Sequence, residues 1–197
     1  MIGDLKGWAK RAARGVSRGA VLPEWALYRV SATVGDADEA FHHASQTLSL
    51  VPGFPGIYMR REFYRMALDA CSDDCCISFG TVISHRGTRI GRRVYVGVQC
   101  NIGLCDIGDD VLFGSGVHVL SGSKQHHIDD VDTPINAQGG TFERVSIGAN
   151  SWIGNGAKVL ADVGQGCVIG AGSVVNKPIP DYAVAVGIPA KVIKHRK

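Results

Sequence analysis

The sequence of 197 residues contains no long hydrophobic run and no strong excess of charge. No apolar segment approaches the ~18 residues that a membrane-spanning helix needs, so the sequence does not indicate an integral membrane protein. The formal net charge of +3 is too small to indicate a nucleic-acid partner. The sequence also lacks Pro/Ser-rich tracts, and its hydrophobic content of 45% is ordinary, which argues against disorder.

We also expect no export signal. Residues 1–22 are basic, but they lack a long apolar core and a convincing small-residue cleavage site. Together with the six cysteines, this indicates a protein of the reducing cytoplasm rather than a disulfide framework. The cluster of Cys71, Cys75 and Cys76 has no second pair at zinc-binding spacing, so we expect no metal site.

Glycine, by contrast, is abundant, with 26 residues, and many of these follow an aliphatic residue. The stretch "VSIGANSWIGNGAKVL" repeats such pairs every six residues, whereas a helix needs a period of 3.6 and a strand a period of 2. The bulky positions of the repeat are Ile77, Ile83, Ile90, Val96, Ile102, Ile107, Phe113, Ile147, Ile153, Val159, Val163, Ile169 and Val175. The step from Ile102 to Ile107 has only five residues.

A second position, four residues after the bulky one, holds a small or β-branched residue. These residues are Val94, Cys100, Val111, Val117, Ser151, Ala157, Cys167 and Ser173. One bulky and one small apolar position suit a short strand followed by a tight corner, where we expect glycine to adopt unusual φ/ψ angles. Stacked units of this kind share one continuous core, in which Cys100 and Cys167 are predicted to be packing residues.

From about residue 70 onward, the chain resembles the hexapeptide-repeat acyltransferases of the sugar O-acetyltransferase type. The closing segment "IGAGSVVNKPIPDYAVAVGIPAKVIK" carries the most specific similarity. The resemblance implies an all-β solenoid, a left-handed parallel β-helix of hexapeptide repeats, for residues 71–197. Residues 1–70 lack the repeat and are expected to form a short α-helical cap over the open end of the β-helix, because unpaired strand edges invite aggregation.

The repeat stops after Val119 and restarts near Val145, which leaves a long inserted loop at residues 120–144. An interruption of this length inside a compact repeat is usually functional. The loop carries His126, His127 and several acids, which either orient an imidazole or solvate the loop.

In the family that the chain resembles, such a loop supplies a histidine as general base. We expect this base to be His126, with His127 as the alternative base. If His126 is the base, His127 lines the pocket or faces solvent. Imidazole suits the task because its pKa, near 6.5, lets it remove a hydroxyl proton near neutral pH. The resemblance also implies that Asn101 contacts the acceptor. His85 and His118, like His42 and His43 of the cap, are expected to be surface or packing residues.

The resemblance implies acetyl-CoA as the acyl donor, bound in a groove between neighbouring β-helices of a homotrimer. Trp152 and Asn155 are expected to line the thioester end. The residues expected along the pantetheine arm are Ala171, Ser173, Asn176 and Lys177. Lys191 and Lys194 are expected to face the nucleotide phosphates, since ammonium groups suit phosphate oxygens. The alternative is that Trp152 caps a corner and the lysines are solvated.

The expected activity is acetyl transfer to a hydroxyl of a saccharide, a polysaccharide or glycolipid precursor, within a ternary complex. One alternative is a metal hydratase similar to the γ-class carbonic anhydrases, which needs three histidines from two subunits around zinc. Such proteins usually continue into a long C-terminal helix, which this sequence does not offer. A second alternative is a non-catalytic scaffold whose loop binds a partner, although a loop with two histidines does not favour it.

Three helical segments are predicted within residues 1–70, at residues 23–30, 36–50 and 57–70, with Asp36 as the cap of the second. Basic residues at near-helical spacing precede them, beside Trp8. These residues are Lys6, Lys10, Arg11, Arg14 and Arg18. They form either a solvated tail or a weak peripheral contact with anionic lipid head groups.

Overall fold

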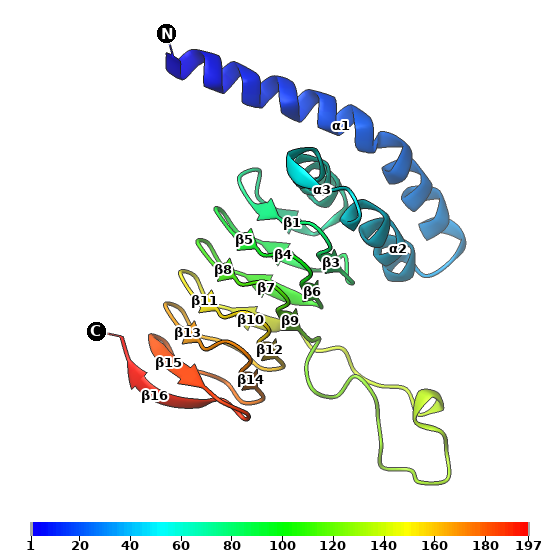
Figure 1. Cartoon of the computed structure of the whole chain (residues 1–197). Helices are drawn as coiled ribbons and strands as arrows, with labels where there is room; N and C mark the ends of the chain where they lie inside the picture. Colours follow the sequence, from blue (N-terminus) through cyan, green and yellow to red (C-terminus); the bar gives the residue numbers. More distant parts are fainter. Residues whose placement is uncertain (1, 197) are drawn as a thin grey trace.

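The computed structural model describes the backbone of residues 2–196 and the side chains of residues 14–196. Three helices come first: α1 (Ile2–Val34), α2 (Ala37–Ser49) and α3 (Gly53–Ala67). Short strands then wind into a three-sided prism, and a long loop leaves the prism between β9 and β10 (Figure 1). The predicted fold, a left-handed parallel β-helix with a helical cap and an inserted loop, is confirmed.

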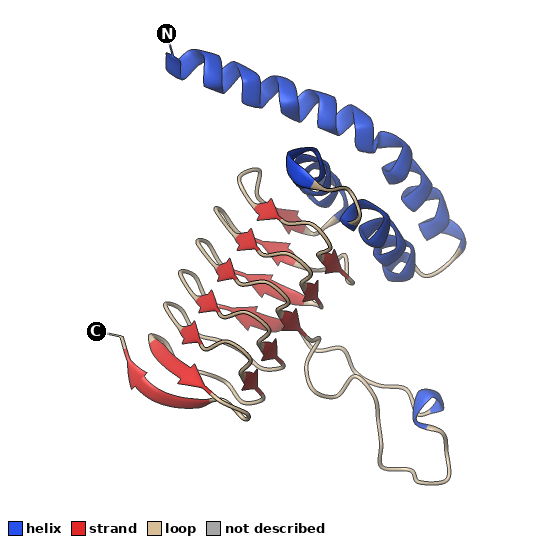
Figure 2. Cartoon of the chain, viewed as in Figure 1, coloured by secondary structure: helices blue, strands red, loops and turns tan. Residues whose placement is uncertain are grey.

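Each side of the prism is one sheet (Figure 2). Sheet A contains β1 (Ala70–Cys71), β4 (Arg89–Ile90), β7 (Cys105–Ile107) and β10 (Val145–Ile147). Sheet B contains β2 (Cys76–Ile77), β5 (Tyr95–Val96), β8 (Leu112–Phe113), β11 (Trp152–Ile153), β13 (Val168–Ile169), β15 (Ala183–Val186) and β16 (Lys191–His195). Sheet C contains β3 (Val82–Ile83), β6 (Asn101–Ile102), β9 (His118–Val119), β12 (Lys158–Val159) and β14 (Val174–Val175).

The bulky repeat positions fill the interior of the prism, as predicted. Ile77, Ile102 and Phe113 are 0% exposed, and complete burial of such a side chain contributes roughly 1.5–3 kcal/mol. The small positions are buried as well, and the thiols of Cys100 and Cys167 point at main-chain carbonyl oxygens 3.2 and 3.0 Å away. These two cysteines are therefore packing residues.

The glycines of the repeat have a different purpose from the predicted one. Left-handed φ angles occur two positions after them, for example at Arg93 (55°) and Gln99 (56°). Gly97 is needed for another reason, because a Cβ atom there would lie 2.7 Å from the main chain of Gly114 in the next coil. The expectation of unusual angles at these glycines was wrong, since their role is to let adjacent coils approach each other.

Helix α1 is one helix of 33 residues rather than a basic tail followed by a short helix. Pro23 lies inside it, although proline lacks the N–H that a helix interior needs. Packing on both sides of Pro23 opposes a break: Val21 is 0% exposed, and the ring of Tyr28 meets that of Phe41 with a centroid distance of 6.1 Å. Tertiary contacts thus override the local preference.

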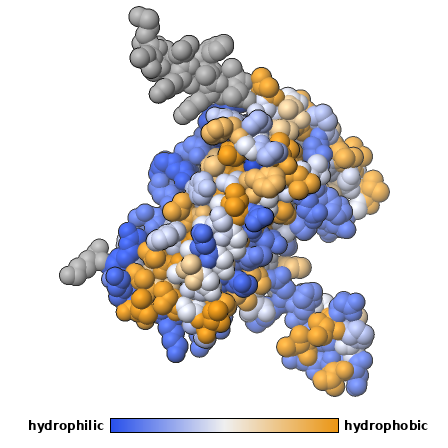
Figure 3. All heavy atoms as spheres, viewed as in Figure 1, coloured by the Kyte–Doolittle hydropathy of each residue, from blue (hydrophilic) through white to orange (hydrophobic). Residues whose placement is uncertain are grey.

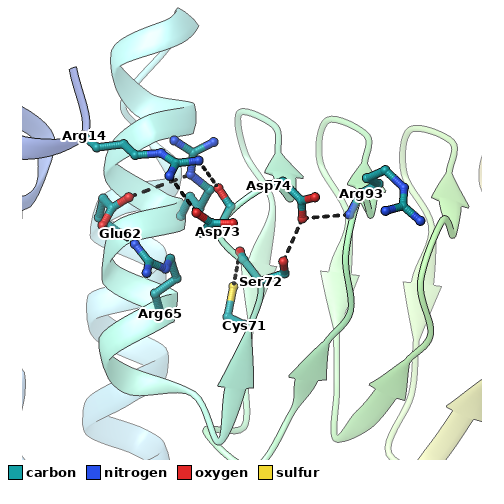
Figure 4. Close-up of polar contacts among 9 residues, drawn as sticks. Arg14, Glu62, Arg65, Cys71, Ser72, Asp73, Asp74 and Arg93 are labelled. Carbon is teal, nitrogen blue, oxygen red and sulfur yellow. Dashed lines mark hydrogen bonds and ion pairs between the residues drawn. The ribbon is translucent and has the colours of Figure 1, made fainter. Parts of the chain in front are cut away.

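Side chains of the predicted basic segment have different environments. Arg14 forms an ion pair with Asp73 at 2.6 Å, which ties α1 to the turn after β1 (Figure 4). Arg18 is exposed. The side chains of Lys6, Lys10 and Arg11 lie outside the described residues.

The cap is joined to the first coil through main-chain groups. Asp36 caps α2 as predicted, because its carboxylate accepts hydrogen bonds from the N–H groups of Asp38 and Glu39 at 2.9 and 2.8 Å. Arg60 of α3 is buried and donates hydrogen bonds to the carbonyl oxygens of Leu48 and Ile77, at 3.0 and 2.9 Å. Within the described residues, none of the helices is long and apolar enough to cross a membrane.

Candidate active site

Polar side chains neighbour one another on the outer face of sheet C. The strand register places Asn101 of β6 beside His118 of β9, and His118 beside Lys158 of β12. All three residues are exposed. Since neighbouring side chains on one face of a sheet lie about 5 Å apart, an amide, an imidazole and an ammonium group form one polar row.

A cleft of about 170 Å³ lies between this face, helix α2 and the base of the inserted loop. Its lining residues are His42, Ser84, His85, Asn101, Gly103, His118, Val119, Leu120, Ser121 and Gln125. Three imidazoles, two amides and two hydroxyls can each donate or accept hydrogen bonds, so the cleft suits a ligand rich in hydroxyl groups.

The histidines of the cleft are held by their neighbours. The Oγ of Ser84 lies 2.8 Å from Nδ1 of His85, and the ring of Phe142, from the returning side of the loop, lies 5.0 Å from the His85 ring. Burial lowers the pKa of His42 below its usual value, and His43 and His85 lower it further. His42 is therefore neutral at physiological pH.

The sequence had indicated surface or packing roles for His42, His85 and His118, and their meeting in one cleft was not predicted. Asn101 and His118 are 17 residues apart, about the length of one coil, so stacked positions on consecutive coils offered a signal for these two. His42 comes from the cap, and no repeat spacing connects it to the prism.

The inserted loop leaves the prism as two antiparallel arms (Figure 1). Main-chain hydrogen bonds join the arms, from Glu143 to Ser121 at 2.9 Å, from Thr141 to Lys124 at 2.8 Å and from His127 to Gly139 at 3.0 Å. His126 lies between the last two of these bonds and is exposed, next to Gln125, which lines the cleft. The arms therefore hold the main chain around His126, one residue beyond the last lining residue of the cleft.

The two loop histidines face different surroundings. His127, also exposed, borders a shallow depression near the loop tip that Asp130 and Gln138 line as well. Asp130 organises this tip: its carboxylate accepts hydrogen bonds from the Thr133 hydroxyl at 2.6 Å and from the Asp132 N–H at 2.9 Å. These bonds lower the pKa of Asp130, first through Thr133. Asp130 thus shapes the loop tip.

The residues expected to bind CoA form two groups. Asn155 and Ala171 stack at the corner between sheets B and C, where the Gly172 N–H bonds the Asn155 carbonyl at 2.8 Å. Trp152 lies on the adjoining outer face of sheet B and is 50% exposed. Lys191 and Lys194 lie on β16 at the end of the same sheet and are exposed.

Three other residues of the expected CoA site lie elsewhere. Asn176 and Lys177 follow β14 at the opposite edge of sheet C, where both are exposed. Ser173 is buried, and its hydroxyl accepts a hydrogen bond from the Gly187 N–H at 3.1 Å. One chain therefore presents Asn155 and Ala171 in one column at the corner between sheets B and C, with Trp152 on the adjoining face of sheet B. Asn176 and Lys177 lie on a second column.

Sheet B carries an apolar outer surface. Its parallel register places Tyr95, Leu112 and Trp152 in one row, and their exposed fractions are 42%, 44% and 50%. Val168 and Val184 continue the row. Exposed apolar rows of this kind mark contact surfaces.

Within the described part of the chain, no group of three or more His, Cys, Asp or Glu side chains is arranged to hold a metal ion. The thiols of Cys71 and Cys75 lie 3.5 Å apart and remain free. Residues 14–196 of a single chain thus offer no donor set for the zinc of a hydratase.

Residues 144–177 match the family described as bacterial transferase hexapeptide (six repeats). The galactoside acetyltransferase solved in complex with coenzyme A has a TM-score of 0.63 and 23% identity, over 82% of this chain and 83% of that chain. A maltose O-acetyltransferase from Clostridium difficile 630 has a TM-score of 0.71 and 24% identity, over 83% of this chain and 90% of that one. These two structures share the fold.

Relatives found by sequence say more about the family of this chain than the two solved structures do. The chain spans between 26% and 51% of the length of the first three relatives it matches, which are named probable or putative acetyltransferases. A serine acetyltransferase from Bacillus pumilus is 32% identical over 172 residues, which cover 82% of this chain and 73% of the relative. Because the repeat, the prism and this extended similarity agree, the chain belongs to the hexapeptide-repeat acetyltransferase family.

Proposed function

We propose that the protein is an acetyl-CoA-dependent O-acetyltransferase whose acceptor is a hydroxyl group of a saccharide. The observation that carries this proposal is the cleft lined by Asn101, His85 and His118, which lies at the base of the loop that carries His126. Family membership supports the reaction class, and the hydrogen-bonding groups of the cleft support an acceptor with several hydroxyls.

In the proposed reaction, His126 accepts the proton of the acceptor hydroxyl while its oxygen attacks the thioester carbonyl carbon. The C–O bond forms, and the carbonyl oxygen becomes an oxyanion that main-chain N–H groups stabilise. The C–S bond then breaks, and the CoA sulfur leaves and takes up the proton from the imidazole. No covalent enzyme intermediate is needed, because both substrates are held together.

For the donor, we propose that the pantetheine arm follows Trp152, Asn155 and Ala171 along the corner between sheets B and C. The stacking of Asn155 and Ala171, with Trp152 on the adjoining face, supports this, as does the galactoside acetyltransferase of the same fold that was solved with coenzyme A. The ammonium groups of Lys191 and Lys194 would meet the phosphates. Asn176 and Lys177 lie on the other edge of sheet C, so they would face the donor of a neighbouring subunit.

We further propose a homotrimer. The loop projects from its own prism, so that a neighbouring prism is needed to place His126 over a donor groove (Figure 1). The apolar row of Tyr95, Leu112 and Trp152 offers a surface for that neighbour.

A hydroxy amino acid is the second candidate acceptor. It is favoured by the similarity to a serine acetyltransferase, of which the chain covers 73%. The cleft volume of about 170 Å³ is also compatible with an acceptor of this size.

The test is CoA release from acetyl-CoA with a panel of monosaccharides, oligosaccharides and L-serine. The variants are His126→Ala and His127→Ala, with His43→Ala, an exposed histidine outside the cleft, as the matched control. Loss of a general base typically lowers the rate 10²–10⁴-fold, which is expected for His126→Ala alone. Equal turnover by the wild type and the three variants would exclude His126 as the base. Turnover with serine alone would identify serine, rather than a saccharide, as the acceptor.

A further inference from the structure

The outer face of helix α1 is apolar over its described length except at Thr33, whose hydroxyl donates a hydrogen bond to the Val30 carbonyl at 2.7 Å. Its exposed residues from position 15 to 34 that lack a polar side chain are Gly15, Val16, Gly19, Ala20, Leu22, Pro23, Ala26, Leu27, Val30 and Val34. At 100° per residue, they cover about 160° of the helix circumference, opposite the buried Val21 and Tyr28. Figure 3 shows patches of hydrophobic surface on the helical region, between hydrophilic ones.

Within this face, the largest side chains are well exposed. Val16, Leu27 and Val30 are 75%, 60% and 63% exposed, and Val34 is 87% exposed. Among residues 14–34, whose side chains the structure describes, no acidic residue lies on this face, and Glu24 is half-buried on the other side of the helix. A soluble helix usually turns charged groups to water, so this face is built to be covered.

Charge identifies the kind of surface that would cover it. Helix α1 contains six basic and two acidic residues, a net charge of +4, whereas the whole chain carries +3, so the remainder is close to neutral. Arg18 and Arg29 are exposed and lie along one edge of the apolar face, next to Leu22. A second copy of the same helix would bring like charges together, whereas an anionic lipid surface complements both the arginines and the apolar side chains.

We propose that helix α1 docks in the plane of an anionic membrane surface, with the apolar face in the head-group region and the arginines on the lipid phosphates. The helix then lies on the membrane rather than across it, in agreement with the lack of a spanning segment among the described helices.

This orientation has a consequence for the acceptor, which rests on the proposed function. A wider depression, lined by Asp36, Asp38, Glu39, His42, Ser84, His85, Leu104 and Phe142, begins beside the end of α1. It shares His42 and His85 with the acceptor cleft. A saccharide attached to a lipid anchor can therefore reach the cleft from a membrane that holds α1. The acids at this entrance favour a neutral sugar over a phosphorylated one.

The test is co-sedimentation of the full chain with vesicles of phosphatidylcholine alone or with 30% phosphatidylglycerol, at low and physiological salt. We expect binding to the anionic vesicles that weakens as salt rises. Each arginine contributes roughly fivefold, so Arg18→Gln/Arg29→Gln should lower the partition coefficient roughly 25-fold. Leu27→Asp/Val30→Asp should abolish binding, whereas Val131→Asp/Ile135→Asp, which places the same charges at exposed apolar positions of the loop, should retain it.

Absence of vesicle binding, or equal binding by Leu27→Asp/Val30→Asp, would overturn the membrane inference. Self-association in solution that only this variant loses would show instead that a second copy covers the face. CoA release with a soluble acceptor should be unchanged in the helix variants, so a failure of membrane docking is separable from a failure of the proposed reaction. If a lipid-linked sugar is acetylated no faster than its soluble form, the inference that the acceptor is attached to a lipid is wrong.

Discussion

Gly140 packs directly against the main chain of Gln125, where the two arms of the inserted loop cross. A Cβ atom on Gly140 would overlap the Gln125 carbonyl oxygen and lie 2.9 Å from the N–H nitrogen of His126. The returning arm therefore leaves no room for a side chain beside the histidine that we propose as the base.

Gly140→Ala should displace His126 and lower kcat at least tenfold, because small errors in the position of a catalytic group are costly. Thermal stability should change little, since the loop lies outside the core. Steady-state CoA release measures the effect, with Thr141→Ala as the control, because only the main chain of Thr141 bonds the other arm. A kcat of Gly140→Ala equal to that of the wild type would show that this contact does not position the catalytic base.

Leu112→Lys should separate the proposed trimer. A charge in the middle of the apolar row between Tyr95 and Trp152 cannot be buried against a neighbour without a large penalty. Light scattering should give a monomer of 20.9 kDa, and acetyl transfer should fall because the donor groove requires two prisms. Ser146→Lys, at an exposed position on the outer face of sheet A, is the matched control. An unchanged mass for Leu112→Lys would place the interface elsewhere.

Arg60→Met should lower the free energy of unfolding by about 3 kcal/mol, because several buried carbonyl oxygens lose their donor. The affected carbonyls are those of Leu48, Val51 and Ile77. Urea denaturation measures the difference. Arg86→Met is the comparison, since the exposed Arg86 only approaches Asp38 at 3.7 Å and should contribute less than about 1 kcal/mol. Similar losses in the two variants would contradict the linking role of Arg60.

Tyr64→Phe should change the response to alkaline pH. Burial raises the pKa of Tyr64 to about 12, while its hydroxyl lies 2.7 Å from the Ser45 hydroxyl. Because the unfolded state ionises near pH 10, the stability from neutral Tyr64 is complete below pH 10 and is lost between pH 10 and 12, by up to roughly 2.7 kcal/mol.

Tyr64→Phe should therefore be less stable than the wild type by about 1 kcal/mol at pH 8, through the lost hydrogen bond, yet decline less steeply above pH 10. Denaturant titrations at pH 8, 10 and 11.5 provide the comparison. Parallel curves for the two proteins would show that Tyr64 does not titrate differently in the folded state.

Periodicity was sufficient to predict stacked short strands around one continuous core, since Ile77 and Phe113 obey the same six-residue rule and both are fully buried. The left-handed, three-sided form of the stack was predicted from the family resemblance. Periodicity also located the loop, because a stacked repeat can be interrupted only at a corner. It misjudged Gly97, because spacing reports which residues recur but not whether the cause is a backbone angle or a neighbouring coil. It also missed the length of α1, where packing of Val21 and Tyr28 overrides the effect of Pro23.

The acceptor cleft was harder to predict. Asn101 was identified through the family resemblance and lies in the cleft, but His42 reaches it from a helix that no repeat connects to sheet C. The division of the expected donor site into two columns could not be predicted either, because a sequence motif does not tell which corner of a prism a residue occupies. Lys177 and Lys191 are only 14 residues apart but lie on different sides of the prism.

The last strand, β16, runs antiparallel to β15, whereas the other strand pairs of the described sheets are parallel. A parallel solenoid that ended on a plain coil would offer its final rung as a template for the first coil of another molecule. The reversed strand covers the final parallel rung of sheet B, and the helices lie over the first coil at the opposite end (Figure 1). Both features oppose end-to-end pairing of one molecule with the next, the pairing through which an unprotected stack of such units would grow into fibres.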